Sequence, residues 1–292
     1  MRIANPIYDV VFKYMMEDLK VAKTFISAII NENVAELDFC PQEFTTRYKD
    51  DSLTVVRMDF LARIKTDDGY KAIIIEMQKA QLATDIRRFR RYLGTQYQSK
   101  SNTYSDEKNK KHARRIYCIF FLGDGLDVPD VPVLTVTNQV KDRATGQELY
   151  LKNEFIDSLH HQSWIVQIPN LKKHRRDDLE KLLSIFDQNR IKDNDHILNV
   201  NEDDFPEEYR HIIRRLKQAA ESEEVAEQMI AEDELISDFQ ELERKIAEQD
   251  EVIEEKDKQM VEKNKQMEEK NKELEKNKKR IEELERQLNQ KN

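Results

Sequence analysis

Two spacings of apolar residues alternate along the first part of the chain, and each predicts a different kind of element. Helical spacing predicts one helix that begins shortly after Pro6 and a second helix over residues 19–30. β-branched and apolar runs on both sides of Asp67-Asp68-Gly69 predict a β-hairpin with strands near 55–64 and 70–76. The chain therefore mixes helices with strands from its beginning.

The same patterns continue to about residue 190. A helical apolar face predicts a helix over 84–104, and the apolar run 115–122, which ends at a Gly-Asp-Gly turn, predicts a buried central strand. Further strands are expected at 133–136 and 163–168, and a short helix at 177–189. These elements predict an α/β domain in which helices flank a mixed sheet.

The chain after Pro206 contains no Gly or Pro, and an apolar residue recurs at every seventh position. The recurring residues are Phe239, Ile246, Ile253, Met260, Met267, Leu274, Ile281 and Leu288. Seven residues is the coiled-coil period, but the second seam position, three residues later, is polar through the middle of the segment. We expect a long helix that pairs weakly, as a homodimer or with another partner. The alternative is a solvated, charged helix without a partner.

A length of 292 residues allows one sizeable domain and an appendage, which we place at 1–205 and 206–292. The formal net charge of -9 is unevenly distributed. From Gln218 onward there are 14 Lys and Arg against 24 Asp and Glu, a net of -10, so the rest of the chain carries +1. The acidic balance belongs to the tail and does not argue against a nucleic-acid partner for the first domain.

The cysteine content and the lack of long apolar runs restrict the class of protein. Cys40 and Cys118 are too few and too far apart for a disulfide framework or a metal cluster, which suits a reducing cytoplasm. No stretch approaches the roughly 20 apolar residues of a membrane-spanning helix, and no secretory signal opens the chain. We expect a cytoplasmic protein without a membrane partner.

Two acids in the predicted hairpin are the strongest candidates for chemistry. Asp59 and Glu76 both lie among strongly apolar residues, where an unpaired carboxylate is expensive to desolvate. One acid on each strand of a hairpin could bind a divalent cation between them, and Gln78, on the same side as Glu76, could orient a water molecule. The alternative is that they are ordinary surface charges, which is the commoner role of isolated acids on strands.

The order of these motifs resembles the PD-(D/E)XK nuclease superfamily, in which an Asp on one strand is followed across a hairpin by Glu-x-Lys. With Gln78 in place of the Lys, the chain is most similar to the PD-(D/E)XK nuclease family transposases, which are related to recombination-promoting nucleases. The matching segments are 9–13, 58–59, 75–78, 88–92 and the apolar strand 116–122. The resemblance covers roughly residues 5 to 200.

This resemblance implies a restriction-endonuclease-like core with a four-stranded mixed sheet, and Mg²⁺-dependent cleavage of DNA phosphodiester bonds, with Mn²⁺ as a possible substitute. Asp59 and Glu76 would hold the metal and its nucleophilic water, and the main-chain carbonyl of Met77 would be a further ligand. Gln78 can orient that water but supplies no charge, unlike the Lys that most of the superfamily has there.

Several basic and aromatic residues are candidates for DNA contacts. Arg88 and Tyr92 are one helical turn apart and can project together toward phosphate, although Tyr92 could equally be a core residue that Arg88 covers. Lys110, Lys111 and Arg114 belong to a basic run at 108–115 that could grip the DNA backbone through charge alone. Short basic runs in loops are more often simply solvated.

Asp9 is a further candidate, because it could approach the metal from the first helix. An ion pair with Lys13, one helical turn away, is the simpler interpretation. The sequence as a whole favours a metal-dependent endonuclease with a helical tail. The main alternative is a catalytically degenerate nuclease fold that binds DNA or a protein through its coiled coil. A coiled-coil scaffold capped by the first domain is a weaker alternative, because the apolar strands demand a substantial core.

Overall fold

The computed structural model describes residues 1–40, 60–78, 90, 93–94, 96–100, 102–126, 128, 130–151, 153–171, 175–192 and 194–289. All structural statements below concern these residues. Asp59, Arg88 and Tyr92 lie outside the described residues, and so does the side chain of Gln78.

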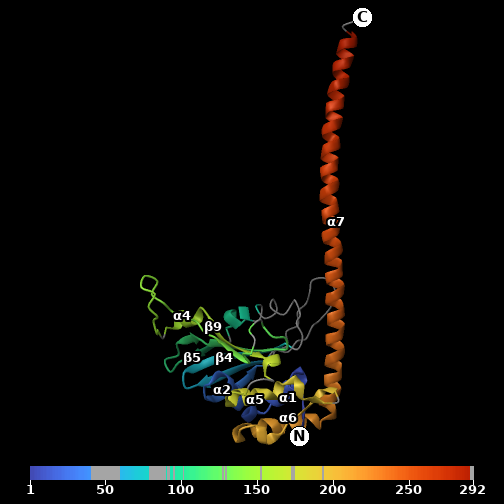
Figure 1. Cartoon of the computed structure of the whole chain (residues 1–292). Helices are drawn as coiled ribbons and strands as arrows, with labels where there is room; N and C mark the ends of the chain where they lie inside the picture. Colours follow the sequence, from blue (N-terminus) through green and yellow to red (C-terminus); the bar gives the residue numbers. More distant parts are fainter. Residues whose placement is uncertain are drawn as a thin grey trace. The chain divides into compact units, whose positions relative to one another are not determined.

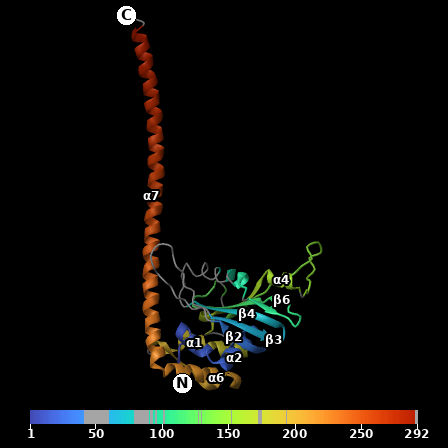
Figure 2. The ribbon, with the colours of Figure 1, turned by 180° about the vertical axis from the view of Figure 1, so that it is seen from behind.

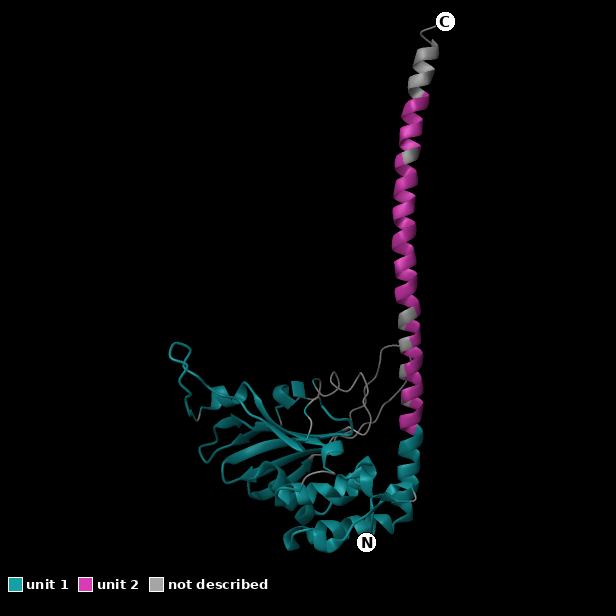
Figure 3. Ribbon diagram, in the orientation of Figure 1, with its two compact units in different colours: residues 1–234 teal, residues 235–292 magenta. Residues whose placement is uncertain are grey.

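The chain divides into two compact units, residues 1–234 and 235–292 (Figure 3). The first unit therefore extends past the boundary expected between residues 205 and 206. It includes helix α6 (Arg210–Ala220) and the first turns of helix α7 (Glu223–Asn289). These helical segments belong to the first unit because they bury apolar side chains in its core: Ile212, Ile213, Leu216, Ala219, Val225 and Met229.

A six-stranded sheet in the order β2-β3-β4-β7-β9-β8 forms the centre of the first unit. The strands are β2 (Val34–Cys40), β3 (Phe60–Thr66), β4 (Gly69–Gln78), β7 (Arg115–Leu122), β9 (His161–Gln167) and β8 (Val133–Val136). Neighbours pair antiparallel except at β4-β7 and β7-β9, which are parallel, so the sheet is mixed. The predicted mixed α/β fold with C-terminal helices is confirmed, and the predicted strand 115–122 is central. The described sheet has six strands rather than the four that the resemblance implies, because β2 and β8 extend its two edges.

The predicted hairpin is confirmed for its described part. Strands β3 and β4 pair from Phe60↔Ile75 to Thr66↔Gly69, and Asp67 and Asp68 form the turn between them. Gly69 opens β4 with φ 106°, a left-handed conformation that a glycine adopts without steric cost.

In the described part of the chain, helices α1 (Asp9–Met16), α2 (Leu19–Ile30), α5 (Asp178–Leu183) and α6 and the first turns of α7 pack with the larger apolar core of the sheet. Figures 1 and 2 show α1, α2 and α6 on the same side of the sheet. The limits of α2 match the sequence prediction because Asp18 caps its first turn, where its side chain accepts hydrogen bonds from the amides of Lys20 and Val21. Aromatic rings fill the interface, with Phe25 stacked on Phe121 at a centroid distance of 6.0 Å.

The opposite face of the sheet carries a smaller apolar cluster. Its buried members are Leu61, Ile74, Ile116 and Cys118, and Leu93 and Phe120 pack against it. Leu93 comes from the segment predicted as a helix over 84–104, in which residues 90, 93–94 and 96–98 are helical. The predicted end of that helix is wrong, because Thr103–Ser105 forms strand β5 and Tyr104 packs its ring against His112.

Short elements complete the first unit, and the sequence patterns did not predict them. They are β1 (Arg2–Ala4), β5 (Thr103–Ser105), β6 (Lys111–Ala113), α4 (Glu154–Ser158), β10 (Ile191–Lys192), β11 (Asn194–Asn199) and 3₁₀ turns at Ile168–Asn170, Ser184–Phe186, Gln188–Arg190, Glu202–Asp204 and Glu207–Tyr209. Strand β1 pairs antiparallel with β11, which ties the first residues of the chain to residues 197–199. The helix predicted over 177–189 ends at Leu183, where 3₁₀ turns replace it.

Two helices, rather than one, follow Pro206. Helix α6 ends at Ala220, and α7 begins after Ser222, whose main-chain carbonyl accepts a hydrogen bond from the amide of Ala226. Helix α7 then continues for 67 residues. Within the described part of the chain, no helix combines the length and apolar character that crossing a bilayer requires.

Candidate functional site at the carboxyl ends of the parallel strands

Glu76 is a buried carboxylate on a central strand. Its side chain is 6% exposed, and Glu76 lies on β4 directly beside Phe120 of β7. Side chains alternate along a strand, so Glu76 shares the face of Ile74 and the smaller apolar cluster, whereas Met77 packs against the larger core. A charge in such surroundings is costly unless another group compensates it.

The site lies near the carboxyl ends of three parallel strands. Gln78, Leu122 and Gln167 are aligned across β4, β7 and β9, and Glu76 lies two residues before the end of its strand. Open α/β sheets bind their ligands beyond the carboxyl ends of the strands, where the connecting loops leave room. This edge of the sheet is therefore the position at which a ligand of this fold is expected.

Gln167 fixes the loop that follows β7 at the same edge. Its side chain is fully buried, its Oε1 accepts a hydrogen bond from the amide of Leu126 at 2.7 Å, and its Nε2 donates to the carbonyl of Val131 at 2.7 Å. Asn170 donates to the same carbonyl at 3.3 Å. The loop between β7 and β8 is thus held by side chains from the end of β9, a contact that the sequence patterns did not predict.

The predicted metal ligands are only partly described. Among the described residues, no group of three or more His, Cys, Asp or Glu side chains is arranged to hold a metal ion, and Asp59 is outside that set. The described donors, the Glu76 carboxylate and the carbonyl of Met77, are oxygen atoms, which suit a hard cation such as Mg²⁺. The residues present fit that cation by type.

Asp59 and Glu76 hold corresponding positions in the sequence of the hairpin. Asp59 directly precedes Phe60, and Glu76 directly follows Ile75, the residue that pairs with Phe60. The described register ends at this pair. In the sequence, the two acids are therefore equally far from the turn residues Asp67 and Asp68.

The predicted DNA contacts of the basic run lie at the other end of the sheet. Lys110 and Lys111 are exposed on the β5-β6 hairpin, and Arg114 precedes β7 with its guanidinium 5.2 Å from the ring centroid of Tyr70. The start of β7 is in register with Lys71, five residues before Glu76. Five residues of strand span about 17 Å, so the structure does not bring this basic run together with Glu76.

His112 connects this basic hairpin to α4. Its Nδ1 lies 3.0 Å from Glu154 Oε2 and its Nε2 lies 3.1 Å from Asp106 Oδ2. Hydrogen bonds to Glu154 and then to Asp106 raise the pKa of His112 above its ordinary value. The protonated imidazole is the form that these two acids favour.

Asp9 forms the expected ion pair with Lys13, at 3.1 Å. Its main-chain amide also donates to Glu232 Oε2 at 2.9 Å, which anchors the first turn of α1 to α7. Helix α1 packs on the larger core, whereas Glu76 faces the smaller cluster. The ion pair is the simpler interpretation that the sequence suggested, and a role of Asp9 in metal binding stays a prediction.

A buried charged cluster on the larger-core face is a feature that the sequence analysis missed. Lys71 is fully buried, and its ammonium contacts Glu32 and lies 2.6 Å from Thr66 Oγ1, while Tyr117 donates to Glu32 at 2.9 Å. Burial alone would raise the pKa of Glu32, but hydrogen bonds from Lys71, Thr66 and Tyr117 lower it below its ordinary value. Burial and the bond to Glu32 raise the pKa of Tyr117. A single lysine within an apolar strand is the only sequence signal for this cluster.

A second unexpected cluster joins the base of α7 to the start of the chain. Tyr8 donates to Asp233 Oδ2 at 3.0 Å, and His196 Nε2 lies 2.8 Å from the same oxygen. Burial and the hydrogen bond to Asp233 raise the pKa of Tyr8. These residues come from three distant segments, so their proximity has no local sequence signal.

Cys118 lies in the small cluster on the same face as Glu76, and its environment excludes nucleophilic catalysis by its thiol. The side chain is fully buried, and burial raises its pKa to about 12. The thiolate, which is the reactive form, is therefore almost absent at neutral pH. Cys118 is an apolar packing residue.

Comparisons with protein-family models, with curated proteins and with solved structures yield no match for this chain.

Proposed function

We propose that the protein is a metal-dependent DNA endonuclease of the PD-(D/E)XK type, from its transposase and recombination-promoting branch. The observation that carries this proposal is Glu76, a carboxylate 6% exposed on a central strand of a mixed sheet, two residues from the end of that strand. The order of the surrounding elements, with helices before a hairpin and a parallel strand after it, supports the proposed fold family.

Asp59 and Glu76 would bind the same cation from two different segments of the chain. The Glu76 carboxylate supplies oxygen ligands from β4, Asp59 supplies them from the segment before Phe60, and the carbonyl of Met77 adds a neutral donor. Bound Mg²⁺ or Mn²⁺ would neutralise charge that develops on the phosphate and lower the pKa of a nearby water molecule. The burial of Glu76 is then explained, because a cation would compensate its charge.

Gln78 orients the attacking water in this account. Its amide can accept a hydrogen bond from the water and donate one to phosphate oxygen, but it holds no charge. The loop beyond β7, which Gln167 holds at Leu126 and Val131, would form the neighbouring rim of the proposed site. The cation would therefore stabilise the charge that develops on the phosphate. The residues of the chain would bind the cation and position the attacking water.

A specific observation favours the second candidate function, a DNA- or protein-binding module that acts through α7. The apolar residues Leu242, Ile246, Ile253, Met260, Met267, Leu274 and Ile281 are 43% to 59% exposed along this helix. A helix with such a line is typical of one that binds another helix. This candidate and the enzyme differ in whether Glu76 must bind a cation.

Calorimetric titration of the full chain with Mn²⁺ and Mg²⁺ tests the proposed site. We expect binding by the unaltered protein and a loss of affinity of at least about 100-fold in Glu76→Gln, because a direct ligand matters more than the outer partners whose loss already costs 10- to 100-fold. Glu36→Gln is the matched control, since Glu36 is an exposed strand acid with a side chain that is 65% accessible. Equal affinities of the Glu76→Gln and Glu36→Gln variants would contradict the proposal.

A further inference from the structure

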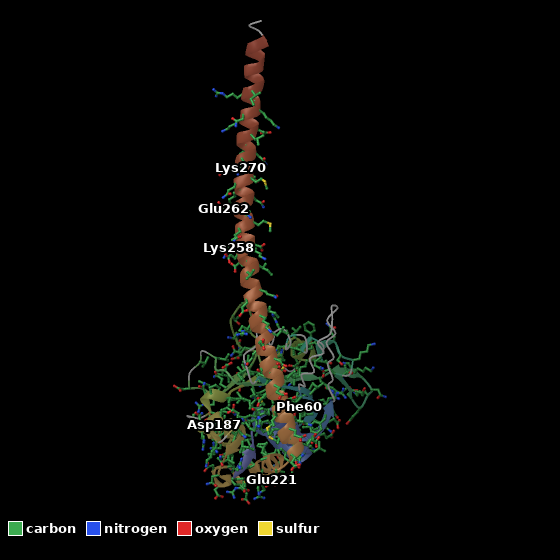
Figure 4. All side chains as sticks on the ribbon, turned by 90° about the vertical axis from the view of Figure 1, so that its right-hand side faces the viewer. Phe60, Asp187, Glu221, Lys258, Glu262 and Lys270 are labelled. Carbon is green, nitrogen blue, oxygen red and sulfur yellow. The ribbon has the colours of Figure 1, made fainter. Side chains whose placement is uncertain are left out.

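The second unit carries one continuous line of apolar side chains. The line consists of Ile246, Ile253, Met260, Met267, Leu274 and Ile281, each between 49% and 59% exposed. Figure 4 shows the polar side chains of Lys258, Glu262 and Lys270 extending from the same helix. A solitary helix of this composition gains little from burial, so the line indicates a surface for a second helix.

The two sides of this line differ in charge. Residues three and four positions after each line residue fall on opposite flanks, because a helix turns about 100° per residue. With the apolar line at the centre of the contact, the second seam position, three residues later, becomes one flank and carries Lys256, Lys263 and Lys270. The other flank, four residues after the line, carries Asp257, Asn264 and Asn271. One flank is therefore cationic, and the other is acidic or neutral.

Two of the flank lysines, Lys256 and Lys263, have no opposite charge at helical spacing within their own helix, whereas Lys270 has Glu273 three residues later. Neighbours at three and four positions before and after Lys256 are Val252, Ile253, Gln259 and Met260, and those of Lys263 are Gln259, Met260, Gln266 and Met267. By contrast, Lys258 on the outer side of the helix is ion-paired with Glu254 at 2.8 Å. Lys256 and Lys263 therefore have no intrahelical ion-pair partner at this spacing and are suited to charges on another chain.

We propose that α7 pairs with the α7 of a second copy of this chain, parallel and in register about this line. In a parallel pair each flank faces the opposite flank of the other helix, so Lys256 meets Asp257 of the second copy. In the same parallel alignment Lys263 and Lys270 lie beside Asn264 and Asn271 of the second copy. They also come near its Glu268 and Glu275, five residues further along, which is the offset of flanking ion pairs in parallel coiled coils. In an antiparallel pair like flanks meet, and the lysine rows would face each other.

Parallel pairing has a consequence for the amino-terminal units. Both would be joined to the same end of the paired helices. If the proposed nuclease function also holds, one assembly carries two cleavage sites, which suits cutting both strands of a duplex. That consequence rests on the proposed function, whereas the pairing does not, so the tests below do not use cleavage as a readout.

Disulfide trapping distinguishes the two orientations. Ile246→Cys and Leu274→Cys are made separately in the full chain, with Cys40 and Cys118 replaced by Ala as background. The two positions are 28 residues, or about 42 Å of helix, apart. We expect each variant to cross-link to itself under mild oxidation. Cross-linking only in a mixture of the two variants would indicate an antiparallel pair and overturn the proposal.

A charge exchange in the otherwise native chain tests the same register without cysteines. Sedimentation over a concentration series should show dimers, and Lys256→Glu should raise the dissociation constant about three- to tenfold, since two symmetric pairs are lost. The double variant Lys256→Glu with Asp257→Lys should restore it. Lys258→Glu, on the outer side, is the matched control and should change little. A full chain that remains monomeric throughout, or that forms assemblies unaffected by Lys256→Glu, would contradict the proposal.

Discussion

At the scale of single residues, burial separates Glu76 and Lys71 from the many exposed charged residues of the chain. Glu76 and Lys71 both belong to β4, yet they face opposite sides of the sheet, and each is buried. Glu76 was predictable from sequence as a candidate functional residue. Burying an acid within a β-branched run costs desolvation free energy unless a partner or ligand compensates its charge. The partners of Lys71 were not predictable, because Glu32 is 39 residues away and reaches it only through the packing of α2 on the sheet.

Substitutions of Gln78 test its role as the residue that positions water. Gln78→Ala should lower turnover by about 10- to 100-fold, because the water loses its orientation, with little change in cation affinity. Gln78→Lys should be tolerated, since a lysine restores the commoner superfamily residue and adds charge. Single-turnover cleavage and calorimetry separate the two effects. A Gln78→Ala protein as fast as the unaltered one would exclude this side chain from catalysis.

The Glu32 cluster predicts a specific pH dependence of stability. The pKa of Glu32 is lowered from 4.5 in the folded protein, so its ionisation stabilises the fold above that value. This contribution is lost as the pH falls through the folded pKa. Glu32→Gln should therefore melt at a lower temperature than the unaltered chain at pH 7, and the difference should shrink toward pH 3. Glu36→Gln is the control, and a difference independent of pH would contradict the assignment.

At the scale of elements, the sequence patterns correctly predicted the helices and strands whose limits depend on neighbouring residues in the sequence. The limits of α2, the β3-β4 turn and the strand 115–122 follow from a cap, a turn and an apolar run, and all three are confirmed. The short strands β1 and β11 were missed because they are stabilised by pairing between the first residues of the chain and residues 197–199. The end of the 84–104 helix was wrong because Tyr104 finds aromatic partners in a hairpin.

The loop after β7 depends on one side chain, which gives a prediction at this scale. Gln167→Ala should remove three hydrogen bonds, of 2.7, 2.7 and 3.4 Å, and lower the free energy of unfolding by about 2 kcal/mol. It should also speed hydrogen exchange at the amide of Leu126, which donates a hydrogen bond of 2.7 Å to Gln167 Oε1. Asn170→Ala, whose bonds are 3.3 and 3.4 Å, should have a smaller effect. Equal effects of the two substitutions would contradict this role for Gln167.

At the scale of the whole molecule, the division into units differs from the one that composition suggests. After Pro206 the chain contains no Gly or Pro, and its net charge becomes acidic. The compact first unit nevertheless continues to Glu234. Amphipathic spacing in α6 marks a helix that packs on a core, whereas the seven-residue spacing begins at Phe239. The candidate site was predictable in its residue types, while the separation of Glu76 from the basic hairpin required the sheet register.

Two truncations test this division. A chain that ends after Glu234 should fold with a melting temperature near that of the full protein and lose self-association. A chain that ends after Lys217 should be strongly destabilised, because it lacks the buried Val225 and Met229 and the Asp233 contact with Tyr8. Circular dichroism melts and sedimentation check both outcomes. Equal stability of the two truncated chains would place the end of the folded unit before α7.

Nicking of a supercoiled plasmid by the purified full chain tests the central proposal most directly. We expect conversion to open circles with Mg²⁺ or Mn²⁺, none with EDTA, and a rate at least about 100-fold lower in Glu76→Gln but unchanged in Glu36→Gln. The melting temperature of each variant shows whether its fold is intact. Absence of cleavage by the unaltered protein with either cation, or cleavage by Glu76→Gln at the unaltered rate, would contradict it.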